Sequence, residues 1–70
     1  MASLVAKARM TALKSQADFA PLLGVTVQTL CKYEQDPDQW MTPNRLKIYY
    51  SNVGQDGKRL LKQYAASFFA

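Results

Sequence analysis

The sequence predicts an all-α fold, and three observations support this prediction. Apolar residues recur at three- and four-residue intervals along the whole chain, which is the spacing of one buried face of a helix. No run of residues alternates between apolar and polar side chains, as a half-buried strand bounded by hairpin turns would. Capping residues and prolines divide the 70 residues into five short segments. We therefore expect a single compact five-helix domain.

The first two expected helices begin at serine residues. Ser3 precedes a helix whose apolar side contains Leu4, Val5, Ala8, Ala12 and Leu13. Ser15 and Asp18 have the spacing of a capping box, so a second helix is expected to follow. It ends at Gly24, because glycine adopts the left-handed conformation of a helix end without steric cost. Pro21 lies inside this helix and removes a backbone hydrogen bond, so we expect the helix to be short.

A third helix and a turn are expected after Gly24. Thr26 has a suitable side chain for an N-cap, and the helix that it begins is expected to run to Tyr33 or Gln35. The residue before a proline avoids the α-helical region. We therefore expect Asp36-Pro37-Asp38-Gln39 to form a turn.

Two more helices complete the expected fold. Thr42 and Pro43 have the residue types preferred at an N-cap and at the first helical position, and the helix they begin is expected to end near residues 52–54. Asp56 starts a fifth helix, with Leu60, Leu61, Tyr64, Ala65 and Phe68 as its apolar residues. The expected core contains Val5, Ala12, Phe19, Ala20, Leu23, Leu30, Tyr33, Leu46 and either Leu60 or Leu61.

Composition restricts the class of protein. The 9 Lys+Arg and 5 Asp+Glu residues give a net charge of +4, which favours a polyanionic partner such as nucleic acid. The chain has one cysteine, Cys31, and no histidine, so neither an internal disulfide nor a metal site is expected. A lone thiol is typical of a reducing compartment, and no segment approaches the ~20 apolar residues of a membrane span. We expect a cytoplasmic protein without a cofactor.

The segment from Gln16 to Glu34 carries the functional prediction. Only residues 24–26 separate the second and third helices, so these helices are expected to cross steeply. Ala20 is small enough to let the third helix approach closely. The residues expected to point into the wedge between the two helices are Phe19, Leu23, Val25, Leu30 and Tyr33. The residues left facing outward are Val27, Gln28, Thr29, Cys31 and Lys32.

This pattern resembles the helix-turn-helix of the phage Cro and repressor family, which also includes small bacterial regulators and antitoxins. From Gln16 to Glu34 the matching sequence reads Q-x-x-x-A-x-x-x-G-V-T-x-x-x-L-x-x-Y-E, and with Arg9 the similarity extends to about residues 9–35. The resemblance implies a lambda-repressor-like fold and an ion pair between Arg9 and Glu34. Family members commonly have glycine two residues after the glutamate, where this chain has Asp36. We therefore expect a different turn after the third helix.

The resemblance also implies sequence-specific binding to a double-stranded DNA operator. In this family the third helix lies in the major groove and presents its N-terminal side chains to base edges. Gln28 is the expected base reader, because a carboxamide can make two hydrogen bonds with adenine. Val27 and the methyl group of Thr29 are candidates for contact with a thymine methyl. Lys32 is a candidate for contact with a guanine or with a phosphate.

Contacts with the DNA backbone are expected from two helix beginnings and from the fourth helix. By the resemblance, Gln16 and Thr26 hold phosphates at the beginnings of the second and third helices, where free amides favour anions. Arg45 and Lys47 add phosphate contacts from the fourth helix. The sequence shows no nucleophile–base spacing and no glycine-rich phosphate loop, so we do not expect an enzyme.

Three functions are consistent with this interpretation: a Cro-like repressor that binds its operator as a dimer, an antirepressor that binds another repressor protein, and the antitoxin of a toxin–antitoxin pair. We expect no separate oligomerisation domain in 70 residues, which favours a Cro-like protein over a full-length phage repressor. Phe68 and Phe69 lie about 100° apart around a helix, so both rings cannot enter one small core. They predict a homodimer interface on the C-terminal helix, or a contact with a partner repressor or toxin.

Overall fold

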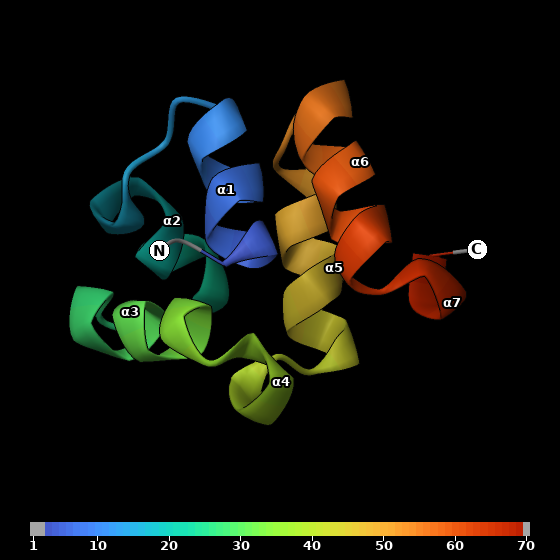
Figure 1. Cartoon of the computed structure of the whole chain (residues 1–70). Coiled ribbons are helices and arrows are strands. Elements are labelled where there is room, and N and C mark those ends of the chain that lie inside the picture. The colour runs from blue at the N-terminus through green and yellow to red at the C-terminus, as the bar shows by residue number, and fades with distance from the viewer. Residues whose placement is uncertain (1–2, 70) are drawn as a thin grey trace.

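All regular secondary structure is helical in the computed structural model, which describes residues 3–69 and, of Phe69, only the backbone (Figure 1). The helices are α1 Leu4–Thr11, α2 Gln16–Leu23, α3 Val27–Gln35, α4 Pro37–Trp40, α5 Pro43–Ser51, α6 Gln55–Tyr64 and α7 Ala66–Phe69. The all-α prediction is confirmed. The described residues form seven helices, however, and not the five that the sequence predicts.

Four predicted N-caps are confirmed. The side chains of Ser3, Ser15, Thr26 and Thr42 each accept a hydrogen bond from the backbone N–H three residues later. At Ser15 the contact is reciprocal, because the carboxylate of Asp18 accepts a hydrogen bond from the backbone N–H of Ser15 at 3.1 Å. That bond lowers the pKa of Asp18. The caps satisfy backbone amides that lack a partner at the start of a helix.

Two helix ends place residues in the left-handed region. Gly24 ends α2 as predicted, with φ 70° and ψ 30°, and α2 accommodates Pro21 in its interior. Leu13 follows the end of α1 with φ 58°, and its side chain is 94% exposed. The prediction that Leu13 lines the apolar side of the first helix is therefore wrong. The helix ends at Thr11, and the left-handed conformation turns the Leu13 side chain away from the core.

The sequence predicts a turn at residues 36–39, and this prediction is wrong. Pro37 begins the single-turn helix α4, since the first residue of a helix needs no N–H donor and proline has a suitable φ. Asp36 adopts φ −137° and ψ 69° and separates α3 from α4. The rule that proline disfavours helix therefore applies to Asp36 and not to the residues after it.

The last predicted helix is interrupted. The sequence predicts one helix from Asp56 through Phe68, whereas α6 begins one residue earlier and ends at Tyr64. Ala65, with φ −141° and ψ 61°, packs against the core and separates α6 from α7. Of the two predicted interface aromatics, Phe68 is 38% exposed, and the side chain of Phe69 lies outside the described residues.

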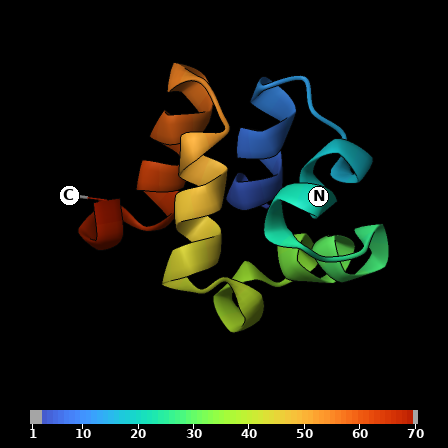
Figure 2. The same ribbon diagram turned by 180° about the vertical axis from the view of Figure 1, so that it is seen from behind.

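The core lies where α1, α2, α3, α5 and α6 meet, and α1 runs between the α2–α3 pair and the α5–α6 pair (Figures 1 and 2). The core residues are Val5, Ala8, Phe19, Ala20, Leu30, Leu46, Tyr49, Val53 and Leu61. Tyr33 is also buried, as predicted, whereas Ala12 and Leu23 are only partly buried and pack against the core. Gly57 allows α6 to pack closely on α1, because a Cβ atom there would lie 2.8 Å from Oγ1 of Thr11 on α1.

None of the helices in residues 3–69 is both long enough and apolar enough to cross a lipid bilayer.

Candidate functional site

The N-terminal turn of α3 presents the predicted base-reading side chains to solvent. Val27 is 43% exposed, Gln28 is exposed and Thr29 is half-buried. The hydroxyl of Thr26 accepts a hydrogen bond from the backbone N–H of Thr29 at 3.2 Å and donates one to its Oγ1 at 3.0 Å. Cys31 is also half-buried, although the sequence predicts that it faces outward. The exposed surface of this turn is therefore formed mainly by Val27 and Gln28.

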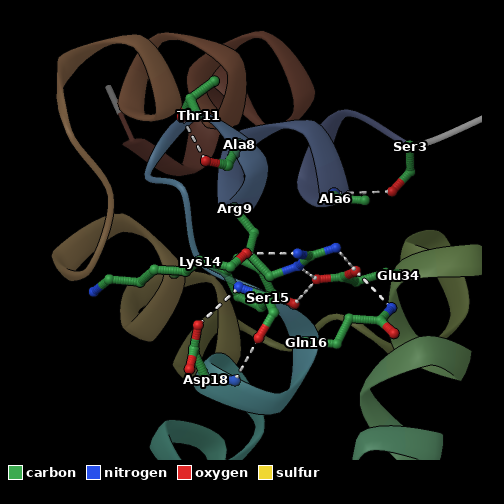
Figure 3. Close-up of polar contacts among 11 residues, drawn as sticks. Ser3, Ala6, Ala8, Arg9, Thr11, Lys14, Ser15, Gln16, Asp18 and Glu34 are labelled. Atoms are coloured by element: carbon green, nitrogen blue, oxygen red, sulfur yellow. Dashed lines mark hydrogen bonds and ion pairs between the residues drawn. The ribbon is translucent and has the colours of Figure 1, made fainter.

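The opposite side of α3 is anchored in the protein interior. Leu30 is completely buried, and Glu34 is only 3% exposed. Figure 3 shows the side chains of Arg9 and Gln16 converging on the Glu34 carboxylate. Its hydrogen bonds come from Arg9 Nε at 2.8 Å, Arg9 Nη2 at 3.0 Å, Gln16 Nε2 at 3.1 Å and the Tyr49 hydroxyl at 2.6 Å. We call these four residues the Glu34 cluster; its members come from α1, α2, α3 and α5.

The predicted ion pair between Arg9 and Glu34 is confirmed, and it is two-pronged. The third prong of the Arg9 guanidinium, Nη1, donates to the backbone carbonyl of Lys14 at 2.7 Å. The hydrogen bond to Glu34 raises the pKa of Arg9. Burial raises the pKa of the Tyr49 hydroxyl, and its hydrogen bond to Glu34 acts in the same direction. Tyr49 is therefore a neutral donor and Arg9 a permanent cation at neutral pH.

Gln16 has two possible roles at the beginning of α2. Its Nε2 donates to Glu34, so part of its amide belongs to the Glu34 cluster. A carboxamide has a second N–H and a carbonyl oxygen that can accept hydrogen bonds. A contact between Gln16 and a phosphate is therefore compatible with its contact to Glu34.

Two basic and two aromatic side chains pack together beside the C-terminal end of α3. The Lys32 ammonium lies 4.2 Å from the ring centre of Trp40, and the Arg45 guanidinium lies 4.2 Å from the ring centre of Tyr33. The two ring centres are 6.1 Å apart. Arg45 Nη1 also donates to the backbone carbonyl of Trp40 at 2.7 Å. Arg45 is half-buried and held by these contacts, whereas Lys32 is exposed.

The structure thus divides the predicted site residues into three places. Thr26, Val27, Gln28 and Thr29 lie together at the start of α3, Lys32 and Arg45 lie beside Trp40, and Gln16 lies against Glu34.

Sequence reasoning missed two residues that support this surface, the buried Tyr49 and the half-buried Trp40. Tyr49 has helical spacing with the buried residues Leu46 and Val53, and a buried hydroxyl needs a hydrogen-bond partner. That requirement was the available signal for a polar contact at Tyr49. The position of Trp40 depends on helix α4, which the sequence does not predict.

A groove of about 180 Å³ lies beside the Glu34 cluster, between α1 and α3. Its lining residues are Ser3, Ala6, Arg9, Met10, Gln16, Cys31, Glu34 and Gln35. The charged groups in this lining, Arg9 and Glu34, are already paired with each other. No three His, Cys, Asp or Glu side chains within the described part of the chain are placed to hold a metal ion.

Comparison with known proteins gives no assignment: no family model matches the chain, and neither a curated protein nor a solved structure matches it. The functional interpretation therefore depends on the motif residues and on the geometry around α3.

Proposed function

We propose that this chain is a small sequence-specific DNA-binding regulator of transcription, a Cro-like repressor, in which α2 and α3 form a helix-turn-helix. The observation that carries the proposal is the contrast between the two sides of α3. Val27 and Gln28 are exposed on its first turn, whereas Leu30 is completely buried. Glu34 is bonded to three other helices. A helix that reads base edges needs exposed side chains on a rigid support.

The proposed contacts follow from the position of each side chain. Gln28 reads a base in the major groove, with Val27 and the methyl of Thr29 against thymine methyl groups. Gln16 and Thr26 contact phosphates at the two helix N-termini, where unpaired amides favour anions. Lys32 and Arg45 add positive charge beside this surface. Lys47, which is exposed on α5, is proposed as a further phosphate contact.

We propose a homodimer as the binding unit. Leu60 and Tyr64 are only partly buried on α6, and Phe68 is 38% exposed on α7, so the C-terminal part of the chain offers an apolar contact surface. Twofold symmetry would place two copies of α3 about 34 Å apart, which is one turn of DNA.

Binding of the full chain to DNA duplexes tests the proposal. A binding site is first selected from a pool of random duplexes, and the affinity of the chain for that site is then compared with its affinity for an unrelated duplex. Gln28→Ala is expected to lose about 1–3 kcal/mol on the selected site and to relax the preference at one base pair. Gln55→Ala is the matched control, because it makes the same change at an exposed position on α6.

Two outcomes would contradict this account. Unchanged preference in Gln28→Ala would show that another residue reads the base. Absence of any preferred duplex for the wild-type chain would contradict DNA-binding regulation itself. An antirepressor is expected to show that second result and to bind a repressor protein, whereas an antitoxin is expected to bind both DNA and a toxin.

A further inference from the structure

Helix α4 is a single turn without a buried residue, yet side-chain contacts tie it to three neighbouring helices. The hydroxyl of Tyr64 on α6 donates to Asp38 Oδ1 at 2.7 Å. Arg45 on α5 donates to the backbone carbonyl of Trp40 at 2.7 Å. The Trp40 ring packs near that of Tyr33 on α3. These contacts hold the Trp40 ring in a defined place beside the C-terminal half of α3.

The Trp40 ring restricts the side chain of Lys32. A solvent-exposed lysine ordinarily samples many rotamers, whereas the attraction between an ammonium ion and an indole ring favours those that bring the two together. Nζ of Lys32 lies 4.2 Å from the ring centre. The ring covers one side of the ammonium, and the remaining N–H donors are available to an anion. Lys32 also lies one turn beyond Gln28, about 6 Å further along the helix axis.

Lys32 is an isolated positive charge in the proposed helix-turn-helix segment. Lys32 is the only Lys or Arg between residues 16 and 35, where Asp18 and Glu34 are the acidic residues. The proposed helix-turn-helix segment therefore carries a net charge of −1, although the whole chain has +4. Binding to DNA requires cations near the phosphates. Lys32 lies at the edge of α3 and supplies this positive charge, because α3 has no other Lys or Arg.

We propose that Lys32 contacts a backbone phosphate and reads no base, and that Trp40 is the positioning residue that holds it there. This inference rests on the proposed function. A lysine ammonium is a compact point charge suited to a phosphate oxygen. Bases are read from the N-terminal part of the recognition helix, whereas the Trp40 ring draws Lys32 toward its C-terminal end.

The test compares the full chain on two duplexes of about 20 base pairs, or two helical turns, one selected and one unrelated. Lys32→Ala is expected to weaken binding to both duplexes by the same factor. It is also expected to lower the slope of log affinity against log salt concentration by about 1 per protomer. Lys62→Ala removes the same charge from an exposed position on α6, a helix that α1 and α5 separate from α3 (Figures 1 and 2). Its slope is expected to stay close to that of the wild type.

Trp40→Leu tests the positioning role, because leucine keeps an apolar side chain and removes the aromatic ring. This variant is expected to weaken binding to both duplexes equally, by a smaller factor than Lys32→Ala. It is expected to have no further effect when Lys32→Ala is already present. Trp40 is the only tryptophan, so the fluorescence of the free Lys32→Ala variant should differ from that of the free wild-type protein.

Each contrary result has a distinct meaning. A wild-type chain that binds neither duplex overturns the proposed function, and this inference with it. If the wild type binds but Lys32→Ala weakens only the selected duplex, Lys32 reads a base and the inference alone fails. If Trp40→Leu weakens binding just as much in the Lys32→Ala background, Trp40 acts only through stability. Unchanged tryptophan emission in Lys32→Ala would overturn the contact itself.

Discussion

Two tyrosine–carboxylate contacts in this protein have almost the same geometry and different surroundings. In the Glu34 cluster, the Tyr49 hydroxyl donates to Glu34 at 2.6 Å, and both residues are buried. Beside α4, the Tyr64 hydroxyl donates to Asp38 at 2.7 Å, where Asp38 is exposed and Tyr64 is half-buried. Burial raises the pKa of both hydroxyls, to about 12 for Tyr64. The contacts differ mainly in their access to water.

Water decides how much each contact contributes to stability. A carboxylate such as Asp38 recovers hydration when its partner is removed, so the loss is small. Glu34 is buried, so water does not replace a lost hydrogen-bond donor. Its negative charge is stabilised by the hydrogen bonds from Arg9, Gln16 and Tyr49. The buried cluster therefore holds four helices in one arrangement, while the exposed contact only orients α4.

The largest expected effect is that of Glu34→Ala. Removal of the carboxylate leaves the guanidinium of Arg9, which is 6% exposed, without its partner. The free energy of unfolding is expected to fall by about 3–5 kcal/mol in urea denaturation. Asp56→Ala is the control, because its ion pair with Arg59 spans 3.9 Å and both side chains are at least 74% exposed. That change is expected to cost about 0–1 kcal/mol.

A double-mutant cycle sharpens this prediction. Arg9→Met combined with Glu34→Leu removes both charges and is expected to be less destabilising than the sum of the two single changes. Additive effects would mean that the two charges act independently, contrary to the two-pronged contact.

An intermediate effect is expected for Tyr49→Phe. The change preserves the ring, whose centre lies 4.6 Å from that of Phe19, and removes only the hydroxyl. Glu34 Oε2 then loses one of its donors in a buried site, so the free energy of unfolding is expected to fall by about 1–3 kcal/mol. A loss no larger than that of Tyr64→Phe would show that burial does not distinguish the two contacts.

The smallest effect is expected for Tyr64→Phe, at about 0–1 kcal/mol, since water replaces the lost partner of Asp38. The pH dependence gives a more direct measurement. The pKa of Tyr64 is raised from 10.0 to about 12, so its contribution to stability is complete below pH 10. That contribution is lost as the pH rises toward 12, because the unfolded chain releases the proton first. The difference in phenolate absorbance between wild type and Tyr64→Phe should titrate near the raised value, and a titration at 10 would contradict the contact.

Sequence reasoning succeeded where structure depends on near neighbours. Ser3, Ser15, Thr26 and Thr42 cap helices as predicted, because each cap bonds to an amide only three residues away. Gly24 has the expected left-handed conformation for the same reason. The local rule for proline was insufficient at Pro37, since proline suits both a turn and the first residue of a helix.

In the candidate site, too, local features could be predicted from the sequence and long-range contacts could not. The order of side chains along α3 follows from its helical period, so the exposed positions of Val27 and Gln28 were open to prediction. The pair of Arg9 and Glu34 was expected only through a family resemblance. Nothing in the local pattern indicates that Tyr49 is also a donor to Glu34.

The sequence by itself determined the all-α class, four helix starts and the exposed first turn of α3, since these depend on residues within one or two helical turns. Only the tertiary structure decided which side chains meet. Arg9 and Glu34 are 25 positions apart, and Tyr64 and Asp38 are 26 apart. Such contacts form because the tertiary fold brings α1 to α3 and α6 to α4. A pattern along the chain specifies each helix face, but not the distant group that faces it.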